Sequence, residues 1–302
     1  MLLVAGGALM VSSLFGWWGV AIARRLPPRQ ATWLLSVGGV VAALSGLAVL
    51  VLLGSLLVGE QPEVASQGHW SATALRDHAP VGTTGVWAAA VLAACLSVGA
   101  AIVAVRRARA VVTAYRSCRQ LPVGAGELIV VPGTAVGAYA IPGRPGRIVA
   151  GQQLLSALSP TERRALLAHE RAHLARGHHW HLAAVTIAAA LNPLLRPLRP
   201  AATCATERWA DESAAEAVGD RRTVAQALAT AARCATAPTR GALAATSHFV
   251  PLRVGALLLP APTPRPLLFR LAVALLTVGV LATVVATKQT EHLYEFARHG
   301  QR

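Results

Sequence analysis

Residues 159–177 read SPTERRALLAHERAHLARG, and an H-E-x-x-H motif lies within them. Residues four apart project from the same face of an α-helix, so His169 and His173 can bind one metal ion. Glu170 directly follows the first histidine and can therefore reach a water at that metal and act as a general base. The motif predicts metal-dependent hydrolysis at a site built on a helix.

The flanking residues predict that this stretch is a helix with defined ends. Ser159 and Glu162 have the spacing of a capping box, with Pro160 at the first helical position. Gly177 is suited to end the helix. The alternative is an amphipathic helix whose polar histidines face solvent. We favour the metal site because the motif falls on a capped helix, which is the context that its mechanism requires.

The composition is typical of an integral membrane protein. Apolar residues make up 54% of the 302 residues and the mean hydropathy is +0.51, which is too apolar for an ordinary soluble domain. Three apolar runs reach the ~20 residues needed to cross a bilayer, at 1–23, 30–59 and 82–105. A fourth apolar run lies at 266–287, and its uninterrupted part, 271–287, is short. The last run contains Arg270, whose side chain can extend to the interface. We therefore expect a mainly α-helical fold with about four transmembrane helices and the lipid bilayer as a partner.

The distribution of arginine predicts the orientation of these helices. Arginines are frequent between the first two runs and after the third, whereas residues 60–81, a predicted polar loop, contain only Arg76. The positive-inside rule then places the N-terminus outside, and it makes the protein a multi-pass protein of the cell membrane. This orientation and anionic lipid explain the net charge of +15 better than nucleic acid does, because no nucleic-acid recognition motif accompanies it. The predicted parts are a three-span membrane region, a cytoplasmic domain, a fourth transmembrane helix and an outside tail, at residues 1–105, 106–265, 266–287 and 288–302.

The middle region alternates strand and helix patterns. Glu127–Val131, Ala135–Ala140 and Arg147–Ala150 read as short strands separated by Pro-Gly turns. A further helix is expected at about 201–218. Residues 182–191 are apolar but too few to span a bilayer, which suits a buried or re-entrant segment. The middle region is therefore predicted to be an α+β domain.

A catalytic zinc site usually has three protein ligands and one water, so the motif needs a third ligand. Downstream of it, the acidic residues of the middle region are Glu207, Asp211, Glu212, Glu216 and Asp220. Glu207 and Asp211 share a helix face, which suits a ligand beside a carboxylate that orients a histidine. Glu212 and Glu216 form a rival pair, and a solvated charged face is the third interpretation. Spacing alone favours Glu207 only slightly.

The motif HERAH followed by ERWADESA resembles the membrane zinc metallopeptidases of the BlaR1/MecR1 type (family M56). It is also similar to the related HtpX and Ste24 group (family M48). Those enzymes pair H-E-x-x-H with a downstream E-x-x-x-D, so the resemblance implies Glu207 as the third zinc ligand and Asp211 as its supporting carboxylate. The lead-in at 137–179 and the segment SHFVPLRVGALL at 247–258 extend the resemblance over roughly 120–258. It implies a cytoplasmic zincin-like (gluzincin) peptidase domain.

Several other residues have two interpretations each. His178, His179 and His181 could support the metal ligands, but a wet helix end or a membrane interface is the favoured location. His248 could stabilise an oxyanion, although a surface histidine is favoured. Tyr139, on a predicted strand, either flanks a substrate added as an extra strand or packs in the core.

These observations predict a membrane-embedded zinc-dependent endopeptidase that cleaves a cytoplasmic or membrane protein, such as a transcriptional repressor. The competing hypothesis is a non-catalytic membrane signalling or scaffold protein with a structural metal site. The presence of Glu170 argues against it, because a structural site needs no general base. A transporter would require ionisable residues inside the spans, and the first three contain none. Since only residues 288–302 follow the fourth span, we expect no extracellular antibiotic-sensing domain.

Overall fold

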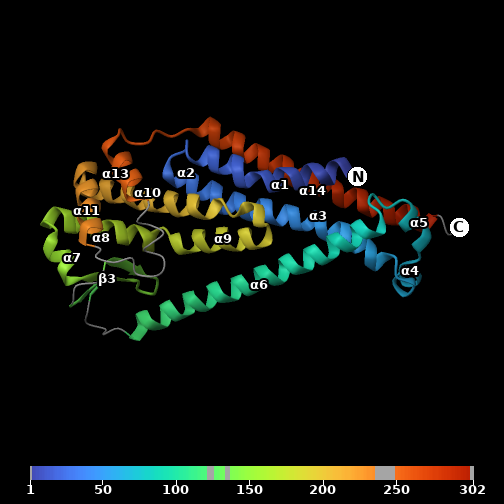
Figure 1. Cartoon of the computed structure of the whole chain (residues 1–302), viewed down its shortest axis with the longest axis horizontal. Helices are drawn as coiled ribbons and strands as arrows, with labels where there is room; N and C mark the ends of the chain where they lie inside the picture. Colours follow the sequence, from blue (N-terminus) through green and yellow to red (C-terminus); the bar gives the residue numbers. More distant parts are fainter. Residues whose placement is uncertain (1, 121–125, 133–136, 235–248, 300–302) are drawn as a thin grey trace.

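The computed structural model describes residues 2–120, 126–132, 137–234 and 249–299. The protein is mainly helical, as predicted, and its long helices run side by side along the long axis of the molecule (Figure 1). A region of shorter helices with one small sheet lies at one end of this bundle.

Helices stand at all four positions where an apolar run was predicted to cross a membrane. They are α1 (Leu2–Ala23), the consecutive α2 (Pro28–Trp33), η1 (Leu34–Gly38) and α3 (Gly39–Gly59), α6 (Thr83–Gln120), and α14 (Pro266–His299). Each is long and apolar enough to cross a bilayer. The η1 segment is one π-helical turn within the second of them.

Two of these helices are longer than the apolar runs. α6 continues to Gln120, whereas the predicted span ends at residue 105, and α14 continues to His299 rather than 287. Arginine, alanine and glutamate are strong helix formers, so the charges that end an apolar run do not end the helix. The predicted boundary between the membrane region and the middle region therefore lies inside α6.

The prediction of a polar loop at 60–81 is wrong, because two short helices lie there. They are α4 (Pro62–Gly68) and α5 (Ala72–Asp77). Proline at the first position of α4 has the fixed φ that a helix start needs, and Ser71 caps α5 by accepting a backbone hydrogen bond. Both signals are local, and the sequence contains them.

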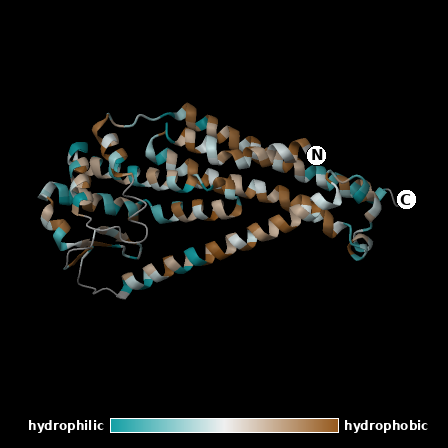
Figure 2. Ribbon diagram, in the orientation of Figure 1, coloured by the Kyte–Doolittle hydropathy of each residue, from teal (hydrophilic) through white to brown (hydrophobic). Residues whose placement is uncertain are grey.

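The outer surface of the bundle is apolar and its two ends are polar. Figure 2 shows hydrophobic residues along α1, α3, α6 and α14, and Val98, Leu271 and Leu281 are each more than half exposed. An apolar surface of this extent needs lipid to cover it. Both termini lie at one end with α4 and α5, and the sheet lies at the other (Figure 1). Assignment of the sheet's end to the cytoplasm stays a prediction.

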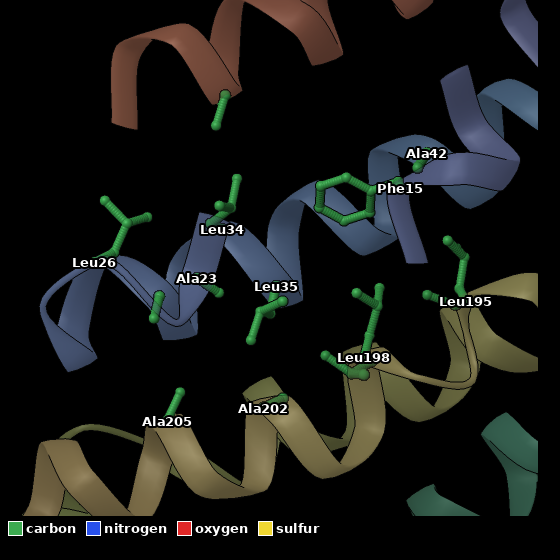
Figure 3. Close-up of a cluster of buried hydrophobic side chains, with 14 of the residues drawn as sticks. Phe15, Ala23, Leu26, Leu34, Leu35, Ala42, Leu195, Leu198, Ala202 and Ala205 are labelled. Carbon is green, nitrogen blue, oxygen red and sulfur yellow. The ribbon is translucent and has the colours of Figure 1, made fainter. Parts of the chain in front are cut away.

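A hairpin from the middle region enters the bundle. It consists of α9 (His178–Leu191), η2 (Pro193–Leu195) and α10 (Leu198–Val218). Its turn reaches the middle of α1, where a Cβ on Gly16 would collide with the carbonyl oxygen of Leu194. Figure 3 shows the shared core, which includes Phe15, Leu34, Leu35, Leu195, Leu198 and Ala202. The apolar run 182–191 is thus part of a helix packed within the bundle, as one of the two predicted alternatives requires.

The sheet has three strands, β1 (Leu128–Val131), β2 (Ala138–Ile141) and β3 (Arg147–Gly151). Their order is β1-β3-β2, with β3 parallel to β1 and antiparallel to β2. All three predicted strands are present, although Ala135 and Val136 of the second lie outside the described residues. β2 is an edge strand, and it packs against the helix that carries the H-E-x-x-H motif.

Five helices share a second core beside the sheet. They are α10 together with α7 (Gln152–Ala157), α8 (Pro160–Ala175), α11 (Arg221–Cys234) and α13 (Val250–Leu258). Their buried contacts include Leu154, Ala165, Ala214, Val224 and Leu257. This core brings the motif helix α8 against α10, which carries the downstream acidic residues.

Candidate metal centre

The motif helix has the ends that its sequence predicts. The Ser159 hydroxyl accepts a hydrogen bond from the backbone N–H of Glu162 at 3.3 Å, and the Ser159 N–H donates to the Glu162 carboxylate at 2.8 Å. Gly177 has φ 59°, the left-handed conformation that ends many helices. These caps fix α8 independently of any metal.

Two histidines of α8 and one glutamate of α10 converge on one point. The Nε2 atoms of His169 and His173 are 3.1 Å apart. The carboxylate of Glu207 lies 3.6 Å from the first Nε2 and 3.7 Å from the second. Tetrahedral ligands that are each ~2.0–2.1 Å from zinc would be about 3.3–3.4 Å apart. The three side chains therefore fit a zinc ion, and they are the group of potential metal ligands found among the described residues.

Asp211 orients the first histidine. Its carboxylate lies 3.0 Å from Nδ1 of His169, on the side of the ring opposite the convergence point, and Asp211 is 2% exposed. A carboxylate on Nδ1 places the proton there and leaves the Nε2 lone pair free for a metal. Glu207 and Asp211 therefore have the arrangement that their shared helix face and the family resemblance both predict.

The rival pair on α10 faces elsewhere. Glu212 forms an ion pair with Arg221 at the start of α11, and Glu216 is exposed. Asp220 is also exposed, and it caps α11 by accepting hydrogen bonds from two backbone N–H groups. None of these three acids joins the histidines. Of the five acids downstream of the motif, the structure thus brings Glu207 and Asp211 to the histidines.

Arg253 is a component of the site that sequence reasoning did not identify by itself. It lies on α13, is 5% exposed, and donates two hydrogen bonds to Asp211 at 2.7 and 2.8 Å. Its third nitrogen lies 2.9 Å from the carboxylate of Glu207. One guanidinium therefore holds both Glu207 and Asp211 in place. The only signal in the sequence is the weak resemblance of segment 247–258.

Glu170 lies next to the converging side chains without being one of them. It is 7% exposed, and its carboxylate lies beside the backbone of Ala140 on β2. Burial raises the pKa of Glu170 above its usual range, although positive charge at His169 opposes the effect. A buried carboxylate with a raised pKa beside an open metal position has the properties of a general base.

The charged groups of this site favour the binding of a cation. Burial alone would lower the pKa of His169, but hydrogen bonds to Asp211 and Glu207 outweigh it and raise the pKa to about 10. Burial likewise opposes ionisation of Glu207, yet the hydrogen bond from His169 and nearby positive charges lower its pKa to about 2. Glu207 and Asp211 are ionised beside the single guanidinium of Arg253, so without a metal the protonated His169 supplies the second positive charge, and a divalent cation held by the three ligands would take its place.

His178 does not lie where the histidines after the motif were expected. A wet helix end or membrane interface was expected, but His178 is 1% exposed and its Nδ1 lies 2.9 Å from Nδ1 of His173. Its ring also packs against Trp209 with 5.0 Å between centroids. The left-handed Gly177 turns the chain back at this point, so the next residue faces α8. His178 therefore supports His173 in the way that Asp211 supports His169.

The remaining candidates lie outside the centre. His181 bonds to the Ser36 hydroxyl at 2.8 Å and so joins α9 to the second long helix, while His179 packs against Trp180. Tyr139 is 46% exposed, which rules out one of its two interpretations, packing in the core. His248 lies outside the described residues, and its proposed role stays a prediction.

Comparison with known families agrees with this geometry. Residues 118–193 match the model of Peptidase family M48. The matched part is about a quarter of the chain and contains the H-E-x-x-H motif, the sheet and α9, but it ends before Glu207. We found no match to the chain among curated proteins or among solved structures. The match supports a relationship to the M48 metallopeptidases, and it does not distinguish the BlaR1/MecR1 type.

Proposed function

We propose that this protein is a membrane-embedded, zinc-dependent endopeptidase. One observation carries the proposal: His169, His173 and Glu207 converge as three potential ligands while the buried Glu170 stays unligated beside them. Structural zinc sites are usually closed by four protein ligands, whereas catalytic sites keep one position open. The alternative, a scaffold with a structural metal, requires neither the open position nor the buried carboxylate.

Zinc suits this donor set and would supply a Lewis acid and an activated water near neutral pH. The chain's own residues would do the rest of the chemistry. Glu170 would take a proton from the attacking water and deliver it to the leaving amine. Asp211 would hold the ring of His169, and Arg253 would keep Glu207 and Asp211 ionised and fixed.

The edge of the sheet is the proposed substrate site. β3 covers one side of β2, and no strand among the described residues pairs with the other side. Because the carboxylate of Glu170 lies beside the backbone of Ala140, this strand passes directly beside the proposed general base. An extended peptide added to β2 would gain main-chain hydrogen bonds there, and the half-exposed Tyr139 would flank it. This is the first of the two interpretations of Tyr139 given above.

The position of the site favours substrates near the membrane surface. Leu198 at the start of α10 lies in the bundle core, and Glu207 follows nine residues later, which is about 13–14 Å along a helix. The proposed role is regulatory cleavage of a cytoplasmic or membrane protein, such as a transcriptional repressor. The resemblance to the BlaR1/MecR1 type supports this role, and the distribution of arginine supports a cytoplasmic site.

The test is the pair Glu170→Gln and His169→Ala, measured for zinc content and for proteolysis in the same preparation. Glutamine keeps the shape of Glu170 but cannot accept a proton, so zinc should stay bound while cleavage falls by ~10²–10⁴-fold or more. His169→Ala should lose both zinc and activity. Wild-type cleavage by Glu170→Gln would falsify the peptidase proposal and would leave the scaffold hypothesis standing.

The Glu170→Gln variant also offers a way to find the substrate. It should still bind the peptide that it cannot cleave, so crosslinking followed by mass spectrometry should recover an uncut partner. Adding Tyr139→Lys to Glu170→Gln would place a flexible charged side chain on the same edge and should weaken that capture without changing zinc content. Equal capture by both variants would contradict binding along β2.

A further inference from the structure

A second polar site lies away from the candidate metal centre, where the first and last long helices begin or end. It is a cavity of about 360 Å³ that four arginines line, Arg24, Arg25, Arg208 and Arg265. They come from the turn after α1, from α10 and from the segment before α14. No acidic residue lines this cavity among the residues that the structure describes. We call it the arginine cavity.

The arginine cavity lacks the partners that buried or crowded charges normally have. Within the described part of the chain, none of its four guanidiniums forms an ion pair with a carboxylate. The Nε of Arg208 is buried and has no hydrogen-bond partner. A buried donor without a partner is unfavourable, and like charges converging on one cavity repel each other. An anion in the cavity would relieve both.

The N-terminus of α14 also favours an anion at this cavity. Arg265 stands directly before Pro266, the first residue of α14. The N-terminus of a helix carries partial positive charge, so a cation there is unfavourable and an anion is favourable. A phosphate at this position would meet free backbone N–H groups of α14 as well as guanidiniums, which bind phosphate oxygens in pairs.

The surroundings of the cavity indicate what carries the anion. Arg24 directly follows α1 and Arg265 directly precedes α14, so the cavity lies where two predicted spans leave the apolar part of the bilayer. Leu258, Leu259 and Leu267 are adjacent in the chain to this site and are 60%, 65% and 70% exposed, and Leu259 lines the cavity itself. Charged donors beside exposed leucines match the two parts of a phospholipid, namely its headgroup phosphate and its acyl chains.

We propose that the arginine cavity binds the phosphate headgroup of one anionic phospholipid. The bound lipid would join four parts of the chain, because the turn after α1, α10, the end of α13 and the segment before α14 all contribute to the cavity wall. It is a specific site rather than a general attraction to charged membranes, since it has a defined volume and a buried donor. It does not depend on the proposed peptidase activity.

The test measures lipid binding by the full-length protein in neutral detergent, using native mass spectrometry and thermal unfolding. Phosphatidylglycerol should stay bound at one molecule per chain and raise the unfolding temperature, whereas phosphatidylcholine should do neither. The double variant Arg208→Gln/Arg265→Gln should bind phosphatidylglycerol at least tenfold more weakly. The matched control is Arg106→Gln/Arg107→Gln, which removes two exposed arginines from α6 near the predicted end of its span.

Three outcomes would overturn the proposal. An equal loss of binding in the control would show that only net charge matters. Inorganic phosphate that protects the wild type as well as the lipid does would make free phosphate the ligand. If the cavity variant binds phosphatidylglycerol as tightly as the wild type does, the arginine cavity is not the lipid site. If the glutamine variant does not fold, Arg208→Lys/Arg265→Lys is used instead. This variant keeps both positive charges but loses the forked pair of N–H donors that arginine offers to a phosphate. Lipid binding should then weaken measurably, by less than tenfold.

Discussion

The bundle of long helices and the region of the metal centre depend on different kinds of contact. The buried residues of the bundle are mostly alanine and leucine, and its helices approach closely at glycines, such as Gly16 against Leu194 and Gly54 against Ala90. Helices in lipid gain little by burying apolar surface, so close packing of small residues decides which of them associate. Such contacts need shape but no particular chemical group.

The metal-site region instead encloses charged groups. Glu170, Asp211 and Arg253 are each at most 7% exposed, and the last two bond to each other. A buried charge is tolerated only when its partners have good geometry. We therefore expect that removal of a charged partner destabilises the metal-site region. Added side-chain volume should instead destabilise the bundle. Each expectation can be tested with a matched pair of variants.

The largest expected effect is the loss of metal. Wild-type protein should bind one zinc per chain. Glu207→Ala should lose the zinc, because only two of the three protein ligands, the histidines, then remain. Glu212→Ala removes the same group five positions later, but that residue pairs with Arg221 and should leave zinc content unchanged. Metal analysis after dialysis distinguishes the two. Zinc lost from the second variant but kept by the first would show that the third ligand is misassigned.

Removal of a buried partner should have the next largest effect. Arg253→Met leaves Asp211 and Glu207 buried without their counter-charge, which should cost about 3–5 kcal/mol of unfolding free energy. The control is Arg171→Met, whose exposed ion pair with Glu127 should be worth ~0–1 kcal/mol. Denaturant unfolding in detergent measures both. Equal costs would contradict the view that burial decides the importance of these ion pairs.

The features that the sequence predicts are those that depend on local patterns. The four apolar helices follow from composition, and α8 follows from its capping box and from Gly177. His169, His173 and Glu170 follow from helical spacing. For Glu207 and Asp211, spacing gave only a slight preference, and the resemblance to known enzymes strengthened it before the geometry brought them together.

The features that the sequence does not predict depend on contacts between distant segments. Arg253 meets Asp211 across 42 positions of the chain, and no periodic pattern marks one arginine among many. His178 was misplaced because its burial depends on the fold around Trp209 and α8. The depth to which the α9–α10 hairpin enters the bundle involves close approaches between distant segments, such as Gly16 to Leu194 and Gly39 to Leu198.

Added volume at Gly16 should destabilise the bundle. The Cβ of Gly16→Ala would collide with the backbone of Leu194, which cannot move away as a flexible side chain could, so the cost should be ~1–3 kcal/mol. Gly7→Ala, in the same helix, has nothing within 4 Å of the new Cβ and should be neutral or slightly stabilising because alanine favours helix. Thermal unfolding in detergent compares them. Similar stabilities would mean that the hairpin does not press against α1.

The smallest expected effect is loss of the cap on α8. Ser159→Ala removes the hydroxyl that accepts the N–H of Glu162, at a cost of ~0.5–2 kcal/mol. Ser156→Ala is the control, because its hydroxyl is exposed and bonds only within α7.

The pH dependence of this pair tests whether the capping box forms. Hydrogen bonds with the Ser159 side chain and backbone lower the pKa of Glu162 below its usual 4.5. A carboxylate with a lowered pKa in the folded state stabilises the protein above its unfolded-state pKa, and this contribution is lost as pH falls through the folded pKa. The difference in unfolding free energy between wild type and Ser159→Ala should therefore be largest near neutral pH and shrink below about pH 4.5. Both proteins should be measured without metal, so that release of zinc in acid does not contribute. A difference that stays constant from pH 7 to pH 3 would show that the Glu162 carboxylate takes no part in the cap.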